Sequence, residues 1–377
     1  MLSFPCVISE NQKFYAEVER QTNWDLTIVA PPSWKTGFDE TRTLTRSPDF
    51  DGELVPIPVW FSGHIPLHLY KSFFTSLLRQ RDPDAIYVHH EAYGLATAQL
   101  YFANRLTSQA PIGFYSAQNI EKAYPPPISW LERFVYGQSD FAFPITDIVE
   151  DVLRSKGYTG STTTVPIGID ETLYNPDDAV RRDEVGLPDD SVVLGYVGRM
   201  VEEKGLHTLL RALTHVRDLP WHLALFGSGP YEETVRTLSE SLGLSDRISH
   251  FGYVPHMEIP PYLATLDLLV VPSETQSDWE EQFGRVIIEG LACETSILGS
   301  DSGYIPTLIE KTGGGMVFPE ADPRACAEQL RTLITDSGQR RTLARRGRRV
   351  VLDRYTNEAV ASRFATAVEA AVEREQT

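Results

Sequence analysis

Cysteine is scarce in this chain, and its scarcity limits how the fold can be held together. Only three cysteines occur in 377 residues, at Cys6, Cys293 and Cys326, and their wide spacing matches neither a disulfide framework nor a metal-binding motif. Each stands among apolar neighbours, so we expect buried, reduced thiols, the usual state in a cytoplasmic protein. A disulfide-stabilised secreted domain and a structural zinc site are therefore not expected.

Long apolar runs are also missing. No stretch approaches the roughly eighteen uninterrupted apolar residues of a membrane span, and the first residues, MLSFPCVISENQ, have neither a basic start nor a long apolar run. We therefore expect no membrane-spanning helix and no export signal. The expected location is the cytoplasm, either free or as a peripheral protein at the inner face of the membrane.

Basic residues are outnumbered by acidic ones. The chain has 34 Lys and Arg against 52 Asp and Glu, which gives a formal net charge of -18. An acidic surface repels the phosphates of nucleic acids and of anionic lipids. Nucleic acid is therefore not an expected partner, and the overall charge gives no support to a polybasic contact with a membrane. The oligomeric state is left open.

What the chain does have is length and a regular alternation of strand-like and helix-like segments. Its 377 residues exceed the size at which one core usually stops growing, which favours two domains. The alternation is typical of parallel α/β layers. The expected strands lie near Cys6 and over residues 26–29, 86–88, 112–115, 141–143 and 164–165 in the first half, and over 192–197, 222–226, 248–251, 268–271, 297–298 and 316–317 in the second.

An Asp-rich and Arg-rich stretch, residues 177–190, separates the two sets of strands and is interpreted as a linker. We therefore expect a first domain over residues 1–176 and a second over residues 191–354, each built on a doubly wound parallel sheet. The last segment, residues 355–377, has the alanine-rich amphipathic pattern of a helix.

The segment EEQFGRVIIEGLACE carries the most informative pair of acids, Glu281 and Glu289. Gly284 opens a helix-compatible run, so the backbone N–H groups near Phe283 and Gly284 would lie at a helix N-terminus. Unpaired donors and the positive end of the helix dipole favour phosphate or sugar oxygens there. The two carboxylates can accept hydrogen bonds from sugar hydroxyls. The alternative is that both are solvated acids on the surface of an amphipathic helix.

A second phosphate-directed signal lies upstream, in VLGYVGRMVEEKG. A buried strand, a turn at Gly198 and a helical pattern after Gly205 form the order found at phosphate sites. Arg199 can form two parallel hydrogen bonds to a diphosphate, and Lys204 can add a positive charge. Either segment alone is a weak signal, since a plain loop with solvated cations gives the same pattern. Both together predict a sugar-nucleotide site.

Several further motifs follow in a fixed order. The chain contains VGRMVEEKG, FGSGPYEE, FGYV, LVVPSE, EQFGRVIIEGLAC and GSDSGYIPTLI, with VPIGID before them and GGGMVFPEADPRACAEQL after them. Together these motifs resemble the C-terminal half of a retaining glycosyltransferase of family 4, or glycosyl transferases group 1. The resemblance implies a GT-B fold, with two Rossmann-like doubly wound parallel-sheet domains facing a central cleft. It also implies that the last helix crosses back to the first domain.

The resemblance implies a reaction as well. A hexose-type sugar would move from a UDP- or GDP-type nucleotide sugar to an acceptor hydroxyl with retained anomeric configuration, in the synthesis of a glycan, glycolipid or glycoconjugate. The implied partners are the nucleotide-sugar donor and a sugar, glycan or lipid-linked acceptor. Two other classes stay open. A sugar-nucleotide epimerase would convert the donor without an acceptor, and a noncatalytic nucleotide-sugar binding protein would turn over nothing.

The expected site residues follow from these motifs. Arg199, Lys204 and the backbone at Phe283 and Gly284 would hold the departing diphosphate, while Glu281 fixes the sugar and Glu289 the ribose. No metal or cofactor is expected, because these groups can stabilise the leaving group by themselves. The expected catalytic residues are Arg199, Lys204, Glu281, His89 and His90, and the expected donor-binding residues are Gly198, Gly227, Ser228, Gly229, Tyr253, Val254, Phe283, Gly284, Arg285 and Glu289.

Three points stay open in the sequence. Relatives often carry a histidine near the donor sugar after the strand at 86–88; counting from the strand favours His89, and adjacency to a glutamate favours His90. Residues 274–280 look like an insertion that either refines donor choice or only extends the surface. The aromatic-rich segment 56–78 is either an apolar landing surface for a lipid-linked glycan or a strand and a core-facing helix.

Overall fold

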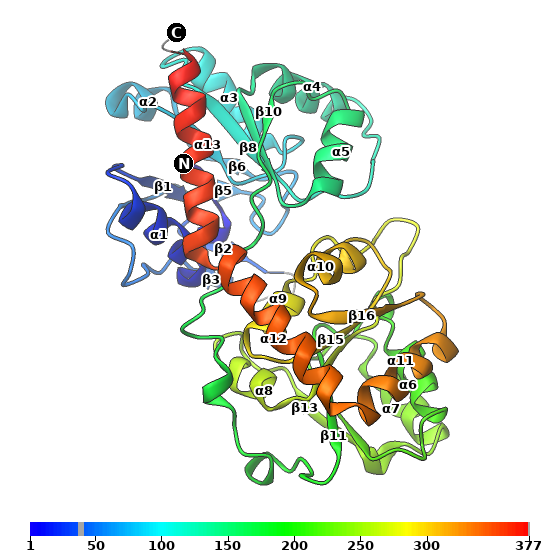
Figure 1. Ribbon diagram of the computed structural model, residues 1–377. Helices are drawn as coiled ribbons and strands as arrows, with labels where there is room; N and C mark the ends of the chain where they lie inside the picture. Colours follow the sequence, from blue (N-terminus) through cyan, green and yellow to red (C-terminus); the bar gives the residue numbers. More distant parts are fainter. Residues whose placement is uncertain (37–40, 376–377) are drawn as a thin grey trace. The chain divides into compact units, whose positions relative to one another are not determined.

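The chain folds into two compact units. The structure is a computed structural model that describes residues 1–36 and 41–375. Unit 1 comprises Met1–Gly168 together with the segment that begins at Asn357, and unit 2 comprises Ile169–Thr356. Each unit has its own sheet (Figure 1). Each also has its own core of buried apolar side chains. The boundary at Gly168 differs from the expected boundary at residue 176.

The parallel sheet of unit 1 has the strand order β10-β9-β8-β7. A separate parallel pair, β1 with β4, is joined to it through Leu2, which forms single parallel bridges to Val29 of β1 and to Val88 of β7. Two short antiparallel hairpins, β2–β3 and β5–β6, were not expected. The strands of unit 1 are β1 (Thr27–Ala30), β2 (Ser33–Lys35), β3 (Thr41–Thr43), β4 (Glu53–Pro56), β5 (Val59–Trp60), β6 (Leu69–Tyr70), β7 (Ile86–Val88), β8 (Ile112–Ser116), β9 (Phe141–Pro144) and β10 (Ser161–Thr162).

The prediction of a strand near Cys6 is wrong. Residues Pro5–Val7 form a 3-10 helix, because Pro5 has a fixed φ and no N–H to give to a strand ladder. The strand expected at 164–165 lies slightly earlier, at Ser161–Thr162. The helices of unit 1 are α1 (Lys13–Gln21), α2 (Thr75–Arg81), α3 (Leu95–Arg105), α4 (Ile128–Gln138), α5 (Asp147–Ser155) and α13 (Asn357–Glu375), with 3-10 helices at Pro5–Val7 and Ser9–Gln12.

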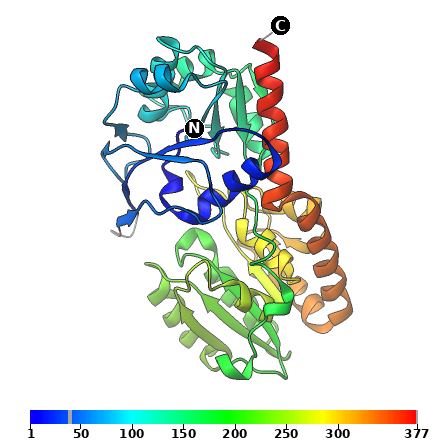
Figure 2. The same ribbon diagram turned by 90° about the vertical axis from the view of Figure 1, so that its left-hand side faces the viewer.

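The last helix, α13, belongs to unit 1 although it follows unit 2 in sequence. It packs on α1 (Figures 1 and 2). Phe364 of α13 is buried, and its ring centroid lies 5.0 Å from that of Tyr87 and 4.9 Å from that of Phe143. Burying aromatic rings on the sheet explains why this alanine-rich segment joins the first unit.

Unit 2 is built on a six-stranded parallel sheet with the order β13-β12-β11-β14-β15-β16. All six expected strands are confirmed to within two residues at each end. The four inner strands, β12, β11, β14 and β15, are short and largely buried, whereas the edge strands β13 and β16 are mostly half-buried. The strands are β11 (Val192–Val197), β12 (Trp221–Phe226), β13 (Ile248–Gly252), β14 (Leu268–Val271), β15 (Ser296–Ser300) and β16 (Gly315–Phe318).

The helices of unit 2 begin where the sequence supplies caps. Asp322 accepts hydrogen bonds from the N–H groups of Arg324 and Ala325 at the start of α11, and Asp336 accepts one from Gln339 at the start of α12. The helices are α6 (Leu206–Thr214), α7 (Glu232–Ser241), α8 (Pro260–Thr265), α9 (Arg285–Ala292), α10 (Ile305–Thr312), α11 (Pro323–Thr335) and α12 (Ser337–Arg354), with 3-10 helices at Pro176–Asp178, Asp183–Val185, Glu202–Lys204 and Ser245–Arg247.

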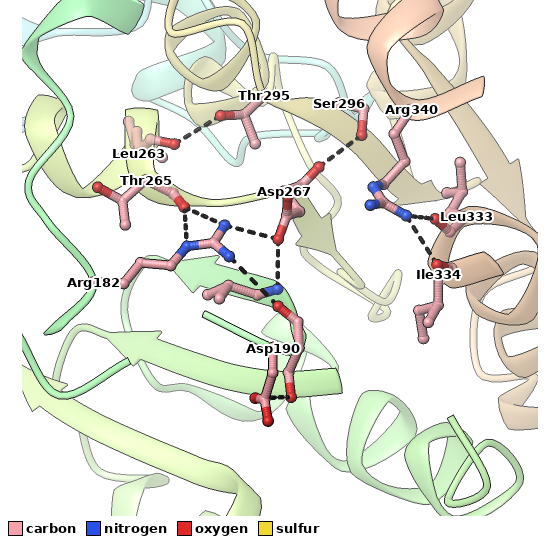
Figure 3. A network of polar contacts seen from close by, with 12 residues as sticks. Arg182, Asp190, Leu263, Thr265, Asp267, Thr295, Ser296, Leu333, Ile334 and Arg340 are labelled. Carbon is pink, nitrogen blue, oxygen red and sulfur yellow. Dashed lines mark hydrogen bonds and ion pairs between the residues drawn. The ribbon is translucent and has the colours of Figure 1, made fainter. Parts of the chain in front are cut away.

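The stretch expected as a linker, residues 177–190, packs on unit 2. Arg182 donates hydrogen bonds to the carbonyl of Thr265 at 2.9 Å and to Oδ2 of Asp267 at 2.8 Å. The same carboxylate oxygen accepts from the N–H of Val193 at 2.8 Å, at the start of the central part of the sheet (Figure 3). An ion pair with these added hydrogen bonds anchors the segment, which explains why it does not behave as an independent linker.

Candidate functional site

The candidate site lies at the carboxyl ends of the central strands of unit 2. The strand order reverses between β11 and β14, since β12 and β13 follow on one side and β15 and β16 on the other. Ligands of open α/β sheets bind outside the carboxyl ends of the strands at such a switch point. The loops that leave β11, β12 and β14 carry most of the residues expected from the sequence.

The turns after β11 and β12 pack backbone against backbone. Gly227 has a φ of +138°, and a Cβ there would lie 1.8 Å from the carbonyl oxygen of Gly198. The N–H of Met200 donates to the carbonyl of Ser228 at 2.9 Å. The two turns therefore form one continuous stretch of packed backbone, which contains the expected turn residues Gly198, Gly227, Ser228 and Gly229. No side chain larger than hydrogen fits at Gly227.

Lys204 and Glu281 meet directly. Nζ of Lys204 lies 2.5 Å from Oε2 of Glu281, and the Ser273 hydroxyl donates to the same oxygen at 3.1 Å. The lysine Nζ also lies 4.8 Å from the ring centroid of Trp279. Both charged side chains are mostly buried, with exposed fractions of 21% for Lys204 and 13% for Glu281. The structure thus brings together a cation and a carboxylate from the two signal segments of the sequence.

The backbone at Phe283 and Gly284 opens α9, as the sequence predicts. Gly284 has a φ of +78°, which favours glycine, and it is the N-cap of a helix that starts at Arg285. As the N-cap, Gly284 has no side chain that could accept a hydrogen bond from the first N–H groups of the helix. A helix start of this kind directs backbone donors and the positive end of the helix dipole outward, next to the loop that carries Glu281.

The loop that carries Glu281 is fixed from the other side. The N–H of Tyr304, the N-cap of α10, donates to the backbone carbonyl of Glu281 at 2.9 Å. The ring of Tyr304 stacks on that of Phe283, with centroids 6.0 Å apart. The backbone that carries the Glu281 carboxylate is therefore held by the N-terminus of α10.

Glu289 is placed differently from Glu281. It is almost fully buried within α9, and its Oε1 lies 2.7 Å from Nε of Arg285, one helical turn earlier. Nη2 of Arg285 lies 2.7 Å from Nε2 of His256, whose Nδ1 lies 3.0 Å from the hydroxyl of Tyr174. Because arginine only donates, Nε2 of His256 accepts and its Nδ1 carries the proton in this arrangement. Burial, together with the nearby Glu289, raises the pKa of Tyr174.

Two of these residues were not expected from the sequence. Tyr174 and His256 lie 82 positions apart and meet only in the folded unit. One feature of the sequence could have identified His256: it closely follows Tyr253 and Val254, after the end of β13. Tyr253 itself is exposed, in keeping with a residue expected to border a ligand.

Arg199 stands apart from the Lys204–Glu281 pair. Its side chain is 59% exposed, and its Nη2 lies 3.8 Å from Oε1 of Glu203. Its backbone carbonyl accepts a hydrogen bond from the Tyr196 hydroxyl at 2.5 Å, which fixes the backbone but leaves the guanidinium on the surface. For Arg199 to bind a diphosphate, its guanidinium would therefore have to leave this weak surface ion pair with Glu203.

The segment 274–280 begins with an anchored residue. Glu274 is buried and accepts from the Thr208 hydroxyl at 2.6 Å, and its other oxygen lies 3.2 Å from Nε2 of His207. Burial by itself would raise the pKa of Glu274, but the contacts with His207 and Thr208 lower it overall. The segment is thus tied to α6 at its start, and it places Trp279 against Lys204.

In unit 1, the two candidate histidines have different surroundings. His90 is buried, and its Nε2 accepts a hydrogen bond from the N–H of Phe4 at 3.0 Å. His89 is partly exposed, and its Nδ1 lies 2.8 Å from the Tyr15 hydroxyl. Burial lowers the pKa of His89 to about 4 and that of His90 well below its usual value, so both rings are neutral at neutral pH.

Glu91, next to these histidines, connects two strand ends of unit 1. Its carboxylate accepts from the Ser116 hydroxyl at 2.8 Å and from the N–H of Ala117 at 2.7 Å, both at the end of β8. Burial raises the pKa of Glu91 to about 7, although these hydrogen bonds act in the opposite direction. The glutamate therefore holds the exits of β7 and β8 together.

Several general expectations can be compared with the whole described chain. Cys6, Cys293 and Cys326 are buried and free, as expected. Over residues 1–36 and 41–375, no group of three or more His, Cys, Asp or Glu side chains is placed to hold a metal ion. In the same ranges, no helix combines the length and the apolar character needed to cross a bilayer.

The fold and sequence match known glycosyltransferases. The structure of HepE from Anabaena in complex with UDP and glucose superposes with a TM-score of 0.73 at 16% identity, covering 98% of each chain. At that identity the likeness shows the fold alone, and this fold is GT-B. The colanic acid biosynthesis glycosyltransferase WcaL of Escherichia coli is 24% identical over 76% of this chain and 70% of its own length. The alpha-D-kanosaminyltransferase of Streptomyces kanamyceticus is 24% identical over 84% of both chains.

The sequence likenesses, together with a family match, identify the chain as a glycosyltransferase. Residues 177–350 match the family described as Glycosyl transferases group 1, a range that contains the strand order reversal, the Lys204–Glu281 pair and the start of α9. Residues 177–350 of the chain therefore form a Glycosyl transferases group 1 domain, which confirms the group 1 part of the resemblance expected from its motifs.

Proposed function

We propose that the protein is a retaining hexosyltransferase of family 4 that uses a UDP- or GDP-type nucleotide sugar and needs no metal ion. The observation that carries this proposal is the contact between Lys204 and Glu281 beside the start of α9. It combines a mostly buried cation, a carboxylate and outward-facing backbone donors within one small region. The cation and the backbone donors suit a diphosphate, and the carboxylate suits the hydroxyls of the attached sugar.

Lys204 and the start of α9 would hold the departing diphosphate. As the bond between the anomeric carbon and the donor phosphate oxygen breaks, negative charge develops on that oxygen, and a fixed cation and helix dipole stabilise it. The ammonium of Lys204 is already held 2.5 Å from Glu281 and 4.8 Å from the ring centroid of Trp279. Little reorganisation of the lysine is therefore needed when the diphosphate binds. These groups supply the charge that a divalent cation would otherwise provide, which supports metal independence.

Glu281 would position the sugar. Ionised carboxylates accept hydrogen bonds from sugar hydroxyls, and this one is fixed by Ser273 and by the backbone contact of Tyr304. The acceptor oxygen would form its bond to the anomeric carbon on the face that the leaving group vacates. The acceptor proton would pass to the departing phosphate oxygen. No enzyme nucleophile is required in this scheme, since positioning and electrostatics lower the barrier.

The remaining site residues take supporting roles in this proposal. Glu289, which is in contact with Arg285, would bind the ribose. Arg285 in turn contacts His256, and Tyr253 and Val254 would border the base. We assign the sugar-facing role to His89, because Nε2 of His90 is already committed to the N–H of Phe4. The HepE structure holds UDP and glucose, which supports a donor of this chemical type.

A screen of nucleotide sugars followed by product analysis tests this proposal. Calorimetric titration with UDP-glucose, UDP-galactose, GDP-mannose and ADP-glucose identifies the donor, and NMR of the product formed with simple sugar acceptors gives its anomeric configuration. The proposal predicts a new glycosidic bond with the configuration of the donor. An isomerised donor formed without acceptor would establish the epimerase alternative, and tight binding without any turnover would establish the noncatalytic one.

A further inference from the structure

Unit 1 exposes a group of large apolar side chains on one short segment. We call residues 59–73, which contain the β5–β6 hairpin, the apolar hairpin. Its exposed apolar side chains and their exposed fractions are Trp60 (52%), Phe61 (61%), Ile65 (46%), Leu67 (47%) and Phe73 (91%). Single exposed apolar residues are common in soluble proteins, but five within fifteen consecutive residues are typical of a surface that meets a partner.

The exposed side chains are held by an ordered backbone. Within the hairpin, Trp60 pairs with Leu69, and Gln99 of α3 exchanges hydrogen bonds with both backbone groups of Tyr70, at 3.0 and 2.8 Å. Tyr70 itself is fully buried, as is Phe74 just beyond the hairpin. The strand and core-facing helix considered from the sequence thus explain Tyr70 and Phe74. They do not explain Trp60, Phe61 or Phe73, which the same backbone directs to solvent.

Phe61 carries an additional conformational cost. Its φ is +57°, in the left-handed region that bulky side chains rarely adopt. The N–H of His64 donates to the Phe61 carbonyl at 3.0 Å, which holds this turn. Phe61 is 61% exposed, so burial of its ring in the core does not offset the cost of this backbone conformation.

The charge of this region differs from that of the rest of the chain. The chain has 52 acidic residues, yet none occurs from Leu54 to Arg81. The same stretch contains Lys71 and Arg79, both exposed, and Nζ of Lys71 lies 5.7 Å from the ring centroid of Trp60. These two cations therefore lie in the same segment as the exposed apolar side chains, and no acidic residue occurs within that segment.

We propose that the apolar hairpin docks unit 1 on the surface of an anionic lipid bilayer. Trp60, Phe61 and Phe73 would enter the boundary between headgroups and acyl chains, where aromatic residues are favoured. Lys71, beside Trp60, would pair with lipid phosphates. The net charge of -18 is a sum over the whole chain and does not reveal the acid-free stretch from Leu54 to Arg81.

A bilayer fits this surface better than a second copy of the chain. Two apolar hairpins packed face to face would bring Lys71 of each copy near the other, and like charges oppose such contact. A bilayer supplies both an apolar layer and a layer of negative charge at a fixed depth. The link to acceptor delivery rests on the proposed function: docking here would bring the transferase to acceptors carried on lipids.

Vesicle flotation in the absence of donor tests the docking directly. The full-length protein is mixed with vesicles of phosphatidylcholine containing phosphatidylglycerol, and with vesicles of phosphatidylcholine alone. We expect clear flotation with the anionic vesicles and weaker flotation with the neutral ones. Phe73→Ser combined with Trp60→Ser should lower the apparent affinity about tenfold or more, since it removes two interfacial aromatic rings.

Two further variants make this test specific. Trp130→Ser removes a comparably exposed tryptophan from α4 of the same unit and should leave flotation unchanged. Lys71→Glu keeps the apolar surface and should weaken binding to anionic vesicles only. This second variant also gives a result if the double serine variant fails to fold.

The docking proposal is overturned if the unmodified protein floats with neither kind of vesicle, or if the double variant and Trp130→Ser bind equally well. It is also overturned if light scattering shows a dimer that dissociates in Phe73→Ser, because the hairpin is then a contact between copies. A failure of donor binding in the calorimetric screen would contradict the proposed function and leave the vesicle result standing.

Discussion

Nζ of Lys204 lies 2.5 Å from Oε2 of Glu281, although the two residues are 77 positions apart in the chain. Lys204 ends the loop that leaves β11, and Glu281 lies in the loop that leads to α9. The contact therefore joins the two strand exits that flank the switch point of the sheet. It is the geometric basis of the function proposed for this glycosyltransferase.

Glu281→Ala should separate sugar positioning from diphosphate binding. We expect kcat to fall about a hundredfold or more, because a group that positions the reacting sugar is lost. The affinity for the nucleoside diphosphate should be equal or higher, since Lys204 no longer shares its charge with the carboxylate. Steady-state kinetics and calorimetric titration of the same preparation measure both quantities. Unchanged kcat would rule out the role given to Glu281.

Gly227→Ala should destabilise unit 2 strongly. The new Cβ would lie 1.8 Å from the Gly198 carbonyl at a φ of +138°, so the turn after β12 has to move. We expect a loss of about 3 kcal/mol or more in the free energy of unfolding. Gly243→Ala is a matched control, because Gly243 also has a positive φ but nothing lies within 4 Å of its added Cβ. The control should lose about 1 kcal/mol. Urea denaturation that gave equal losses would contradict the close packing of the two turns.

The stability of unit 1 should respond to pH through opposing groups, of which Glu91 and His89 are two. Burial raises the pKa of Glu91 from 4.5 to about 7, so between these values the folded state holds a proton that the unfolded state has lost. Stability from this group therefore falls as pH rises from 4.5 to 7. Burial lowers the pKa of His89 from 6.5 to about 4, so there the unfolded state holds the extra proton. Stability from His89 rises with pH over that window.

Glu91→Gln should therefore reveal the histidine contribution. We expect its unfolding free energy to rise with pH between about 4.5 and 6.5 more steeply than that of the unmodified protein, by up to about 1.4 kcal/mol per pH unit. Denaturant unfolding at several pH values, followed by a probe in unit 1, provides the measurement. Parallel curves for the two proteins would show that Glu91 titrates normally in the fold.

Chelation should leave transfer intact. Lys204 and the start of α9 supply the charge for the leaving diphosphate in the proposed mechanism. We therefore expect the rate with excess EDTA to equal the rate with added magnesium or manganese. Complete loss of transfer with EDTA, restored by either cation, would show that a metal ion stabilises the charge of the leaving diphosphate.

The sequence was sufficient for the sheet of unit 2 and for β1, β7, β8 and β9 of unit 1, but not for the two hairpins of unit 1. Each strand of unit 2 is a short apolar run bounded by polar or turn residues, which is a strong local signal. The hairpins β2–β3 and β5–β6 have two or three residues per strand and leave no periodic pattern. The prediction of a strand near Cys6 was wrong for a related reason, since the pairing of the first residues with β1 and β7 is limited to the single bridges of Leu2 and does not form a strand.

The candidate site was predictable where its residues are close in sequence to a glycine turn. Lys204 and Glu281 were both expected there, and the fold brings them together. Tyr174 and His256 were missed because only tertiary packing brings them to Arg285. The segment 177–190 was taken for a linker because its composition is polar, whereas the contact of Arg182 with Asp267 depends on a residue far along the chain.

The central claim is that Lys204 and the start of α9 bind the diphosphate of a nucleotide sugar. Calorimetric titration with UDP and GDP tests it most directly, using the unmodified protein, Lys204→Ala and Arg349→Ala, which removes an exposed cation of α12. The account predicts that one of the two nucleotides binds the unmodified protein and Arg349→Ala equally well, and that Lys204→Ala binds it at least about tenfold more weakly. Equal affinity for all three proteins would contradict the account.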